Sequence, residues 1–137
     1  MATELYKTAV RAVILDHQNR VMLGLRSKET SPGYNQWALF GGKPKEKETL
    51  KKATVREVKE EIGLNIRVKR LFTTTLDKST TPHDPWMVYF YVVEIIGGNL
   101  QIKLDEHSRA EYFSREQLEG IDIAFNHRNV LADFFTS

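Results

Sequence analysis

One stretch, residues 49–62, constrains the fold more than any other part of the chain. It contains no glycine or proline, and Gly63 follows at the position where helices commonly end in a glycine. We therefore expect one strong helix from Thr49 to Ile62. The segments around it are rich in Val, Ile, Thr and aromatic residues, which favour strands. A helix set among strands predicts an α/β or α+β domain rather than a helical bundle.

Strands are predicted on both sides of this helix. Before it, residues 7–16 and 20–26 read as strands, and the polar turn at 17–19 between them predicts a hairpin. Glycines at 97 and 98 indicate a turn in the second half of the chain. The strand-forming segments after the helix are residues 65–76, 86–96, 100–104 and 109–113.

Two further helices are predicted near the C-terminus. Ser114 with Gln117 fits a capping box, in which each side chain bonds the backbone of the other residue at a helix start. The last stretch, residues 124–135, can form a terminal helix. No linker, repeat or low-complexity tract divides the chain, so we expect a single domain over residues 1–137.

The composition excludes several classes of protein. The chain has no cysteine, which rules out a disulfide scaffold, a thiolate zinc site and cysteine catalysis. Its formal net charge of +2 is too small to indicate a nucleic-acid-binding protein, although small anionic substrates remain open. The N-terminus lacks the pattern of a signal peptide, and no apolar run is long enough to span a membrane. We therefore expect a cytoplasmic protein without a membrane partner.

The predicted helix carries three glutamates on one face. Glu57, Glu60 and Glu61 are spaced i, i+3 and i+4, so they lie side by side along the helix. The roughly opposite face holds the aliphatic residues that we expect to be buried, Val55, Val58 and Ile62. Neighbouring like charges repel by a few tenths of a kcal/mol per pair, and a divalent cation would reverse that cost. On spacing alone, a solvated acidic surface is the commoner outcome.

The context of the glutamates changes that interpretation. From Gly42 the sequence reads GKPKEKETLKKATVREVKEEIGL. It fits the pattern G-x5-E-x7-R-E-U-x-E-E-x-G-U, where U is a large aliphatic residue. With about 7% for each of the seven fixed residues, chance agreement is on the order of 10⁻⁸ per start position. Residues 42–64 therefore closely resemble the box that defines the Nudix family.

The resemblance extends beyond the box. Residues 37–42, WALFGG, are similar to the family's W-x-L-P-G-G segment, with Phe40 where proline is usual. Residues 105–107 (DEH), 112–114 (YFS) and 117–118 (QL) resemble a downstream segment of many members. Because every charged position of the box is intact, the departure at Phe40 is not expected to threaten activity.

Membership of this family implies a fold and a reaction. Nudix proteins are α/β/α sandwiches with a mixed sheet between helices, and the box forms a loop, a helix and a loop. They hydrolyse nucleoside diphosphates linked to another group, usually with Mg²⁺ or Mn²⁺. A cation of this kind neutralises the phosphates and lowers the pKa of bound water, and a nearby carboxylate can then accept a proton.

The resemblance also implies roles for individual residues. Arg56 and Glu48 would form an internal ion pair that orients the catalytic carboxylates. Glu57 and Glu61 are the first candidates for the general base, and Glu106 is the third. The implied metal ligands are Glu57, Glu60 and Glu61, with the carbonyl of Gly41 and the carboxylate of Glu106 as further candidates.

The substrate is less constrained by the sequence. The similarity to MutT-type members favours a nucleoside triphosphate, oxidised or ordinary, which would yield a nucleoside monophosphate and pyrophosphate. The candidate base contacts are Tyr34, Trp37, Phe40 and Asn126, with Phe72, Trp86 and Tyr89 as other aromatic candidates. Core packing or helix capping is the commoner role for each of these residues. His83 and His107 are expected to be exposed in loops without a catalytic role.

Several alternatives stay open. The substrate could be ADP-ribose or another nucleotide sugar, or the triphosphate at the 5′ end of an RNA. The domain could also be a catalytically silent nucleotide sensor, although a sensor need not keep the whole box. Both a monomer and a homodimer are compatible with the sequence. Five lysines near the box could steer phosphates or form an ordinary solvated surface, namely Lys43, Lys45, Lys47, Lys51 and Lys52.

Overall fold

The computed structural model describes residues 6–137, so the first five residues of the expected domain lie outside the described part. Four strands precede the first helix, three strands follow it, and two helices come last. In chain order the elements are β1 (Lys7–Ile14), β2 (Val21–Arg26), β3 (Trp37–Ala38), β4 (Phe40–Gly42), α1 (Leu50–Ile62), β5 (Leu64–Asp77), β6 (Trp86–Gly98), β7 (His107–Phe113), α2 (Arg115–Leu118) and α3 (His127–Thr136). No helix among residues 6–137 is long and apolar enough to cross a membrane.

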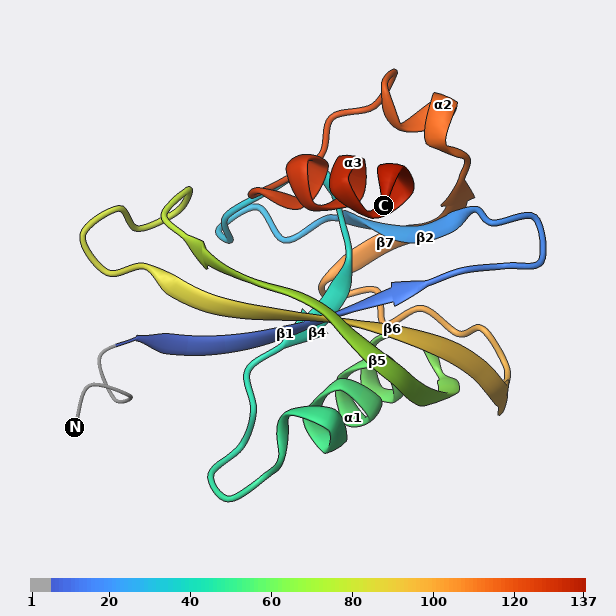
Figure 1. The fold of residues 1–137 in the computed structure, drawn as a ribbon, viewed down its shortest axis with the longest axis horizontal. Coiled ribbons are helices and arrows are strands. Elements are labelled where there is room, and N and C mark those ends of the chain that lie inside the picture. The colour runs from blue at the N-terminus through green and yellow to red at the C-terminus, as the bar shows by residue number, and fades with distance from the viewer. Residues whose placement is uncertain (1–5) are drawn as a thin grey trace.

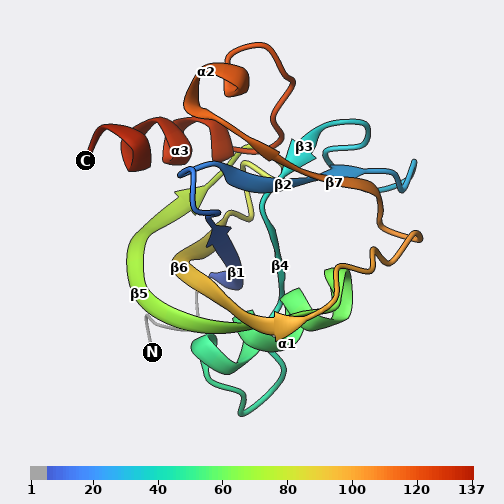
Figure 2. The same cartoon turned by 90° about the vertical axis from the view of Figure 1, so that its right-hand side faces the viewer.

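The strands form two sheets, with helices on the outside (Figures 1 and 2). The larger sheet has the order β4-β1-β6-β5 and is mixed, because β1 runs parallel to β6 and antiparallel to β4. The smaller sheet, β3-β2-β7, is antiparallel. Helix α1 lies against one side of the larger sheet, and α3 lies on the other (Figure 1). The predicted α+β sandwich with a mixed sheet is confirmed.

The predicted hairpin between the first two strands is wrong. β1 and β2 belong to different sheets and share only an isolated bridge between Leu15 and Val21. Both strands are buried almost continuously rather than on alternate residues. A strand with partners on both edges and packed layers on both faces has this pattern. The turn between them is held by Asp16, whose carboxylate accepts hydrogen bonds from the backbone N–H groups of Gln18 and Arg20.

The predicted strand at residues 100–104 does not form. β6 instead continues through both glycines to Gly98, and the chain then passes the end of α1. There the backbone N–H of Gln101 donates to the carbonyl of Ile62, and that of Lys103 donates to the carbonyl of Glu61. The last carbonyls of a helix have no partner within the helix. The backbone N–H groups of this segment bind the end of α1, and the segment therefore does not pair with a strand.

Helix α1 ends at Ile62 as predicted and begins at Leu50, one residue later than predicted, because Thr49 is its N-cap. The Thr49 side chain accepts a hydrogen bond from the N–H of Lys52 at 3.2 Å. Gly63 takes a left-handed conformation with φ of 76° and ends the helix, as a glycine at this position favours. The predicted capping box of Ser114 and Gln117 is likewise present at the start of α2.

The orientation of α1 differs from the expectation in one respect. Val58 and Ile62 are buried as predicted, but Val55 is 36% exposed. Glu61 is only 4% exposed, so it does not face outward with Glu60. The buried side of the helix includes the small residues Ala53 and Thr54, which let it approach the sheet closely. The helix is therefore rotated so that Glu61 faces inward.

Alternate side chains of β1 face opposite sides of the sheet, and this decides which side carries the candidate site. Val10 and Ile14 pack with α1, whereas Ala9 and Val13 belong to the core on the α3 side. Arg11 lies between Ala9 and Val13 on the α3 side, because alternate residues of a strand share a face. A large charged residue therefore stands in the middle of an otherwise apolar row.

Candidate active site

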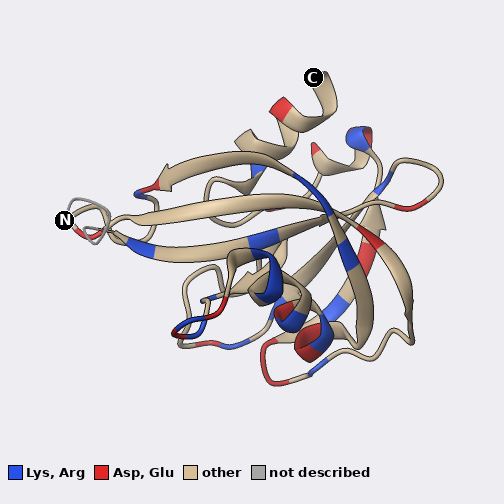
Figure 3. Ribbon diagram, turned by 60° about the horizontal axis from the view of Figure 1, so that its bottom comes forward, with Lys and Arg blue, Asp and Glu red and all other residues tan. Residues whose placement is uncertain are grey.

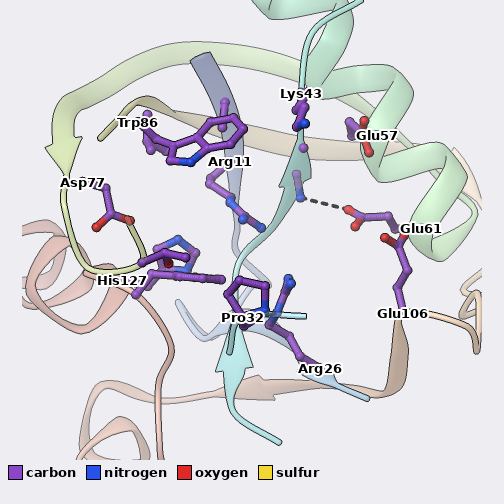
Figure 4. Close-up of a pocket in the computed structure, with 16 residues that line it drawn as sticks. Arg11, Arg26, Pro32, Lys43, Glu57, Glu61, Asp77, Trp86, Glu106 and His127 are labelled. Carbon is purple, nitrogen blue, oxygen red and sulfur yellow. Dashed lines mark hydrogen bonds between the residues drawn. The ribbon is translucent and has the colours of Figure 1, made fainter. Parts of the chain in front are cut away.

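A cavity of about 480 Å³ lies over the middle of β1 (Figure 4). It is lined from β1, β4 and α1, by the end of β5, the start of β6 and the start of α3, and by loops between them. A cavity of this volume is within the range of small-molecule sites. Its two ends differ in chemistry, with glutamates at one end and Asp77, Trp86 and His127 at the other (Figure 4).

Glu61 is the most enclosed of the glutamates at the first end. Its Oε1 accepts a hydrogen bond from the backbone N–H of Gly41 at 2.9 Å (Figure 4). Burial raises the pKa of Glu61 to about 8, opposed by the positive charge of Arg11 and assisted by the negative charges of Glu57 and Glu106. These three carboxylates are thus near enough to repel one another. A bound cation would relieve that repulsion.

Glu57 lies against a glycine that leaves room for it. A Cβ atom on Gly42 would stand 2.6 Å from the carboxyl carbon of Glu57, so any side chain at this position would displace the carboxylate. Burial also raises the pKa of Glu57 above its ordinary value. The close contact explains in physical terms why a glycine opens the box.

Arg56 joins the box residues in one network. Its guanidinium binds both oxygens of Glu48, with Nε–Oε2 and Nη2–Oε1 distances of 2.8 and 2.9 Å. Nη1 also donates to Glu57 and to Glu60, each at 3.0 Å. The hydrogen bonds from Arg56 lower the pKa of Glu48 to about 2. The predicted Arg56–Glu48 ion pair is therefore present, and it fixes one oxygen of Glu57.

Two predicted metal ligands have different surroundings. Glu106 borders the cavity beside Glu61 and Glu57. The side chain of Glu60 is 48% exposed and lies outside the cavity, bound to Arg56. Figure 3 shows how basic and acidic residues alternate along α1 and its preceding loop. The roles of Glu60 and of the Gly41 carbonyl as ligands stay predictions.

The glutamate end has the donors that a hard divalent cation requires. Within residues 6–137 no group of three or more acidic or histidine side chains is already close enough to enclose an ion. Mg²⁺ commonly binds through one or two carboxylates, several waters and the substrate's phosphates. The oxygen donors of Glu57, Glu61 and Glu106 at one end of the cavity fit that mode of binding, rather than a closed cage of protein ligands.

Three cationic side chains border the same cavity. Arg11, Arg26 and Lys43 come from β1, β2 and the loop after β4. Burial lowers the pKa of Arg11 to about 10, so the residue still carries its charge at neutral pH. Arg11 Nη1 donates to the carbonyl of Leu39 at 2.8 Å, which fixes the guanidinium. Fixed arginines bind phosphate oxygens well.

Sequence reasoning selected neither arginine. The only signal for Arg11 is its position inside the apolar strand of residues 7–14, and Arg26 gives no comparable signal. Both guanidinium groups lie over the ring of Phe125, at 5.4 and 5.1 Å from its centroid. Phe125 has φ of 59°, a left-handed conformation that is rare for an aromatic residue. Such strain often accompanies a functional site. Of the five lysines proposed to steer phosphates, only Lys43 borders the cavity.

The far end of the cavity holds polar groups that the sequence did not identify. Asp77 is 9% exposed, and its Oδ1 accepts a hydrogen bond from the N–H of Ser79 at 2.9 Å. His127 is 2% exposed, and its Nδ1 accepts from the N–H of Leu39 at 3.2 Å. Burial lowers the pKa of His127 well below its ordinary value. Each stands in a polar stretch of the sequence, and no motif marks either one.

The predicted base contacts lie elsewhere in the fold. Phe40 is fully buried, 4.9 Å from the ring of His107, and has no surface left for a ligand. Trp37 packs edge-on against Phe113 at 4.8 Å. Tyr34 is 48% exposed and does not border the cavity. The expectation that His107 is exposed is wrong, because it is only 1% exposed.

Two other candidates also serve the fold. The side-chain amide of Asn126 donates to the hydroxyl of Thr75 at 3.0 Å, and Phe72 packs on Phe134 at 5.2 Å. Of the aromatic residues named from the sequence, Trp86 borders the cavity. Its indole is therefore the remaining candidate for contact with a flat base.

Comparisons with known proteins agree with this geometry. The family model described as the NUDIX domain matches residues 5–134. A protein of Methanocaldococcus jannaschii named ADP-ribose pyrophosphatase is 31% identical over 121 residues, which is 88% of this chain and 69% of that protein. A relative from Caenorhabditis elegans is 29% identical over 124 residues, and the chain spans 32% of its length.

Two solved structures share the fold at low sequence identity. The MutT protein of Methanosarcina mazei superposes with a TM-score of 0.74 at 22% identity, covering 87% of this chain and 84% of that one. The NUDIX domain of Shewanella oneidensis NrtR, solved with ADP ribose, gives 0.75 at 22% identity, covering 96% and 87%.

Proposed function

Because this chain belongs to the Nudix family of hydrolases, we propose that it cleaves the phosphoanhydride bond of ADP-ribose. The products would be AMP and ribose 5-phosphate. The proposal rests on one observation: a set of acidic side chains and a set of basic side chains border the same cavity. The carboxylates of Glu57, Glu61 and Glu106 border one end, and three cationic side chains border the same cavity. A diphosphate needs both a cation and cationic side chains around it.

The sequence alone ranks a nucleoside triphosphate first, whereas the comparisons support ADP-ribose as the first candidate. The curated relative at 31% identity is named for ADP-ribose, whereas the MutT likeness is one of fold. A triphosphate remains the second candidate, because Arg11, Arg26 and Lys43 offer three positive charges along one cavity. Such a substrate would yield a nucleoside monophosphate and pyrophosphate.

The residues of this chain have distinct tasks in the proposed reaction. Arg11 and Arg26 hold phosphate oxygens and withdraw the negative charge that would repel an incoming water. Glu57, Glu61 and Glu106, with Glu60 as a further proposed ligand, would hold the divalent ion, Mg²⁺ or Mn²⁺. When bound, that ion neutralises phosphate charge and lowers the pKa of water.

The proton of the attacking water passes to a carboxylate. Arg56 fixes Oε2 of Glu57 at 3.0 Å, and Gly41 fixes Oε1 of Glu61 at 2.9 Å, so each side chain keeps one oxygen in a defined position for the cavity. Both glutamates are therefore candidates for the base, because a base must be held within hydrogen-bond reach of the water. Glu106 is exposed and lacks such a fixed position in the described structure, which ranks it third.

A substrate panel tests the proposal. Purified protein is incubated with Mg²⁺ or Mn²⁺ and ADP-ribose, nucleotide sugars, ordinary and oxidised nucleoside triphosphates, and a triphosphorylated RNA, and the products are separated by chromatography. We expect AMP and ribose 5-phosphate from ADP-ribose, with loss of turnover in EDTA and in Glu61→Gln. The control is Lys51→Gln, an exposed residue of α1 outside the cavity.

The other outcomes each have a definite meaning. Pyrophosphate released from one triphosphate, with ADP-ribose untouched, would make the second candidate the substrate. Tight nucleotide binding without turnover of any compound would contradict hydrolysis and favour the sensor.

A further inference from the structure

We infer that Asp77 and His127 read the hydrogen-bonding edge of the substrate's base, and that they select a base with an amino group beside a ring-nitrogen acceptor, as in adenine. The inference rests on the proposed function and names the residues that decide which nucleotide fits. Both side chains border the end of the cavity away from the glutamates (Figure 4). The phosphates would lie at the glutamate end, so the base would lie at this one.

The far end of the cavity has an aromatic and aliphatic wall, with the ammonium groups of Lys7 and Lys43 over the ring of Trp86 at 5.4 and 5.2 Å from its centroid. Asp77, the last residue of β5, lies directly opposite Trp86 of β6 in the strand pairing. Trp86 borders the cavity together with Ala9 and Val88. Aromatic and aliphatic walls with a few polar groups are typical of sites that hold a planar ring. The polar groups then determine which ring is accepted.

His127 offers a single donor to such a ring. Its Nδ1 accepts the hydrogen bond from Leu39, so in the neutral imidazole the proton is on Nε2. Nε2 has no hydrogen-bond acceptor among residues 6–137. It is also not fully enclosed by protein atoms. The imidazole borders the cavity, so Nε2–H is available to a ligand acceptor.

Asp77 offers the complementary acceptor. An ionised carboxylate can only accept hydrogen bonds. Ser79 occupies Oδ1, and within the described part of the chain Oδ2 has neither a hydrogen bond nor an ion pair. Arg11 is near enough to attract the Asp77 carboxylate but forms no ion pair with it, and Oδ2 is not enclosed by protein atoms among the described residues. Oδ2 is therefore open to an N–H donor of a ligand.

The two residues together distinguish bases by pattern rather than by shape. Adenine presents an amino donor at C6 next to the N1 acceptor, which match Asp77 and His127. Hypoxanthine has the same outline with the pattern reversed, because its C6 oxygen accepts and its N1–H donates. In the pose that suits adenine, that oxygen would face the carboxylate of Asp77 and the two would repel. Selectivity for an amino group at this position follows.

The experiment compares kcat/KM for ADP-ribose and its hypoxanthine analogue in wild type and Asp77→Asn. We expect wild type to prefer the amino base by roughly 10- to 100-fold, the usual size of such a contact. In Asp77→Asn the carbonyl oxygen can keep the bond to Ser79, which places the NH₂ group toward the base. The preference should then shift toward hypoxanthine by about 10-fold or more.

A matched control is available in the loop that follows Asp77. Asp84 is exposed and pairs with Lys7 at 2.7 Å, outside the cavity. Asp84→Asn makes the same chemical change and should leave the ratio of the two substrates unaltered. The test of His127 uses the ADP-ribose analogue with 1-deazaadenine, which lacks the N1 acceptor. Its kcat/KM with the wild-type protein should be about 10-fold lower than that of ADP-ribose.

The outcomes separate this inference from the proposed function. In one outcome, Asp77→Asn lowers kcat/KM equally for both bases while the wild-type protein still hydrolyses ADP-ribose. Asp77 would then only stabilise the local structure, and the inference would be wrong while the proposed function would stand. If ADP-ribose is not a substrate but triphosphates are, ATP and ITP provide the same contrast. Should Asp77→Asn not fold, the wild-type ratio still decides, because a wild type indifferent to the C6 group overturns the inference.

Discussion

The carboxylate of Glu61 accepts a hydrogen bond from the backbone N–H of Gly41 at 2.9 Å. The bond ties α1 to β4, and it forms only because the backbone can approach closely at this point. Gly41 is paired with Arg11 of β1, and a Cβ atom at Gly41 would lie 1.9 Å from the carbonyl oxygen of Val10. The position of Glu61 therefore depends on a strand pairing that admits no side chain.

The two neighbouring glycines should respond differently to alanine. In Gly41→Ala the new methyl group would contact the backbone of β1, which cannot move without opening the β1–β4 pairing. We therefore expect the free energy of unfolding to fall by about 2 kcal/mol or more. In Gly42→Ala it meets the side chain of Glu57, which can turn away, so stability should change little while kcat falls by about 10-fold or more. Urea unfolding and steady-state kinetics measure the two effects. A Gly42→Ala protein with full activity would contradict the placement of Glu57.

The three box glutamates should not be equivalent. Glu61 is enclosed and Glu57 is held by Arg56, whereas the Glu60 side chain is 48% exposed outside the cavity. At saturating Mg²⁺ we expect Glu57→Gln and Glu61→Gln to lose about 10²-fold or more in kcat, and Glu60→Gln to lose less and to require more Mg²⁺. Titration of activity with Mg²⁺ checks this order. Equal losses in all three, unchanged by added Mg²⁺, would show that Glu60 turns inward.

The parts of the fold that local sequence decides were predictable. The limits of α1 follow from Thr49 and Gly63, and the ion pair between Arg56 and Glu48 follows from the family resemblance. The separation of the first two strands into different sheets was not predictable, because it depends on partners from distant parts of the chain. The same holds for Val55, whose exposure is set by how α1 rotates against the sheet.

The cavity was predictable at one end only. Its glutamates share one motif, so a single pattern finds them. Arg11, Asp77 and His127 come from three separate elements and meet only in the folded chain. No spacing in the sequence relates them. Trp37 and Phe40, which the sequence suggested as base contacts, pack in the core instead. Burial of a large aromatic ring is favourable wherever the ring packs well.

The pairing of Glu48 with Arg56 predicts how stability depends on pH. The pKa of Glu48 is lowered to about 2 in the folded protein from an ordinary 4.5. The ionised form is therefore favoured by folding, and its contribution is complete above pH 4.5 and is lost as pH falls through about 2. Wild type should be more stable than Glu48→Gln at pH 7, and the difference should shrink toward pH 2. Thermal unfolding across this range measures it.

The exposed neighbour Glu46 provides the control for that experiment. Glu46 lies in the same loop, and none of the hydrogen bonds or ion pairs assigned within residues 6–137 involves it. Glu46→Gln should therefore show no pH-dependent difference from wild type. A Glu48→Gln protein that tracked wild type at every pH would contradict the stabilising role of the ion pair.

Arg11 provides the most direct test of phosphate binding in the cavity. Its guanidinium is fixed by the carbonyl of Leu39 at 2.8 Å and keeps its charge at neutral pH, because burial lowers its pKa only to about 10. Arg11→Lys retains the charge but loses the planar fork, so we expect kcat/KM to fall by about 10-fold; Arg11→Met loses both and should fall by about 10²-fold or more.

Arg67 serves as the comparison for this series. It pairs with Glu94 on the surface, where its side chain is 66% exposed, so Arg67→Met should leave kcat/KM unchanged. If Arg11→Met folds and retains wild-type kcat/KM, the phosphates do not reach the middle of the cavity, and the division into a glutamate end and a base end would have to be abandoned.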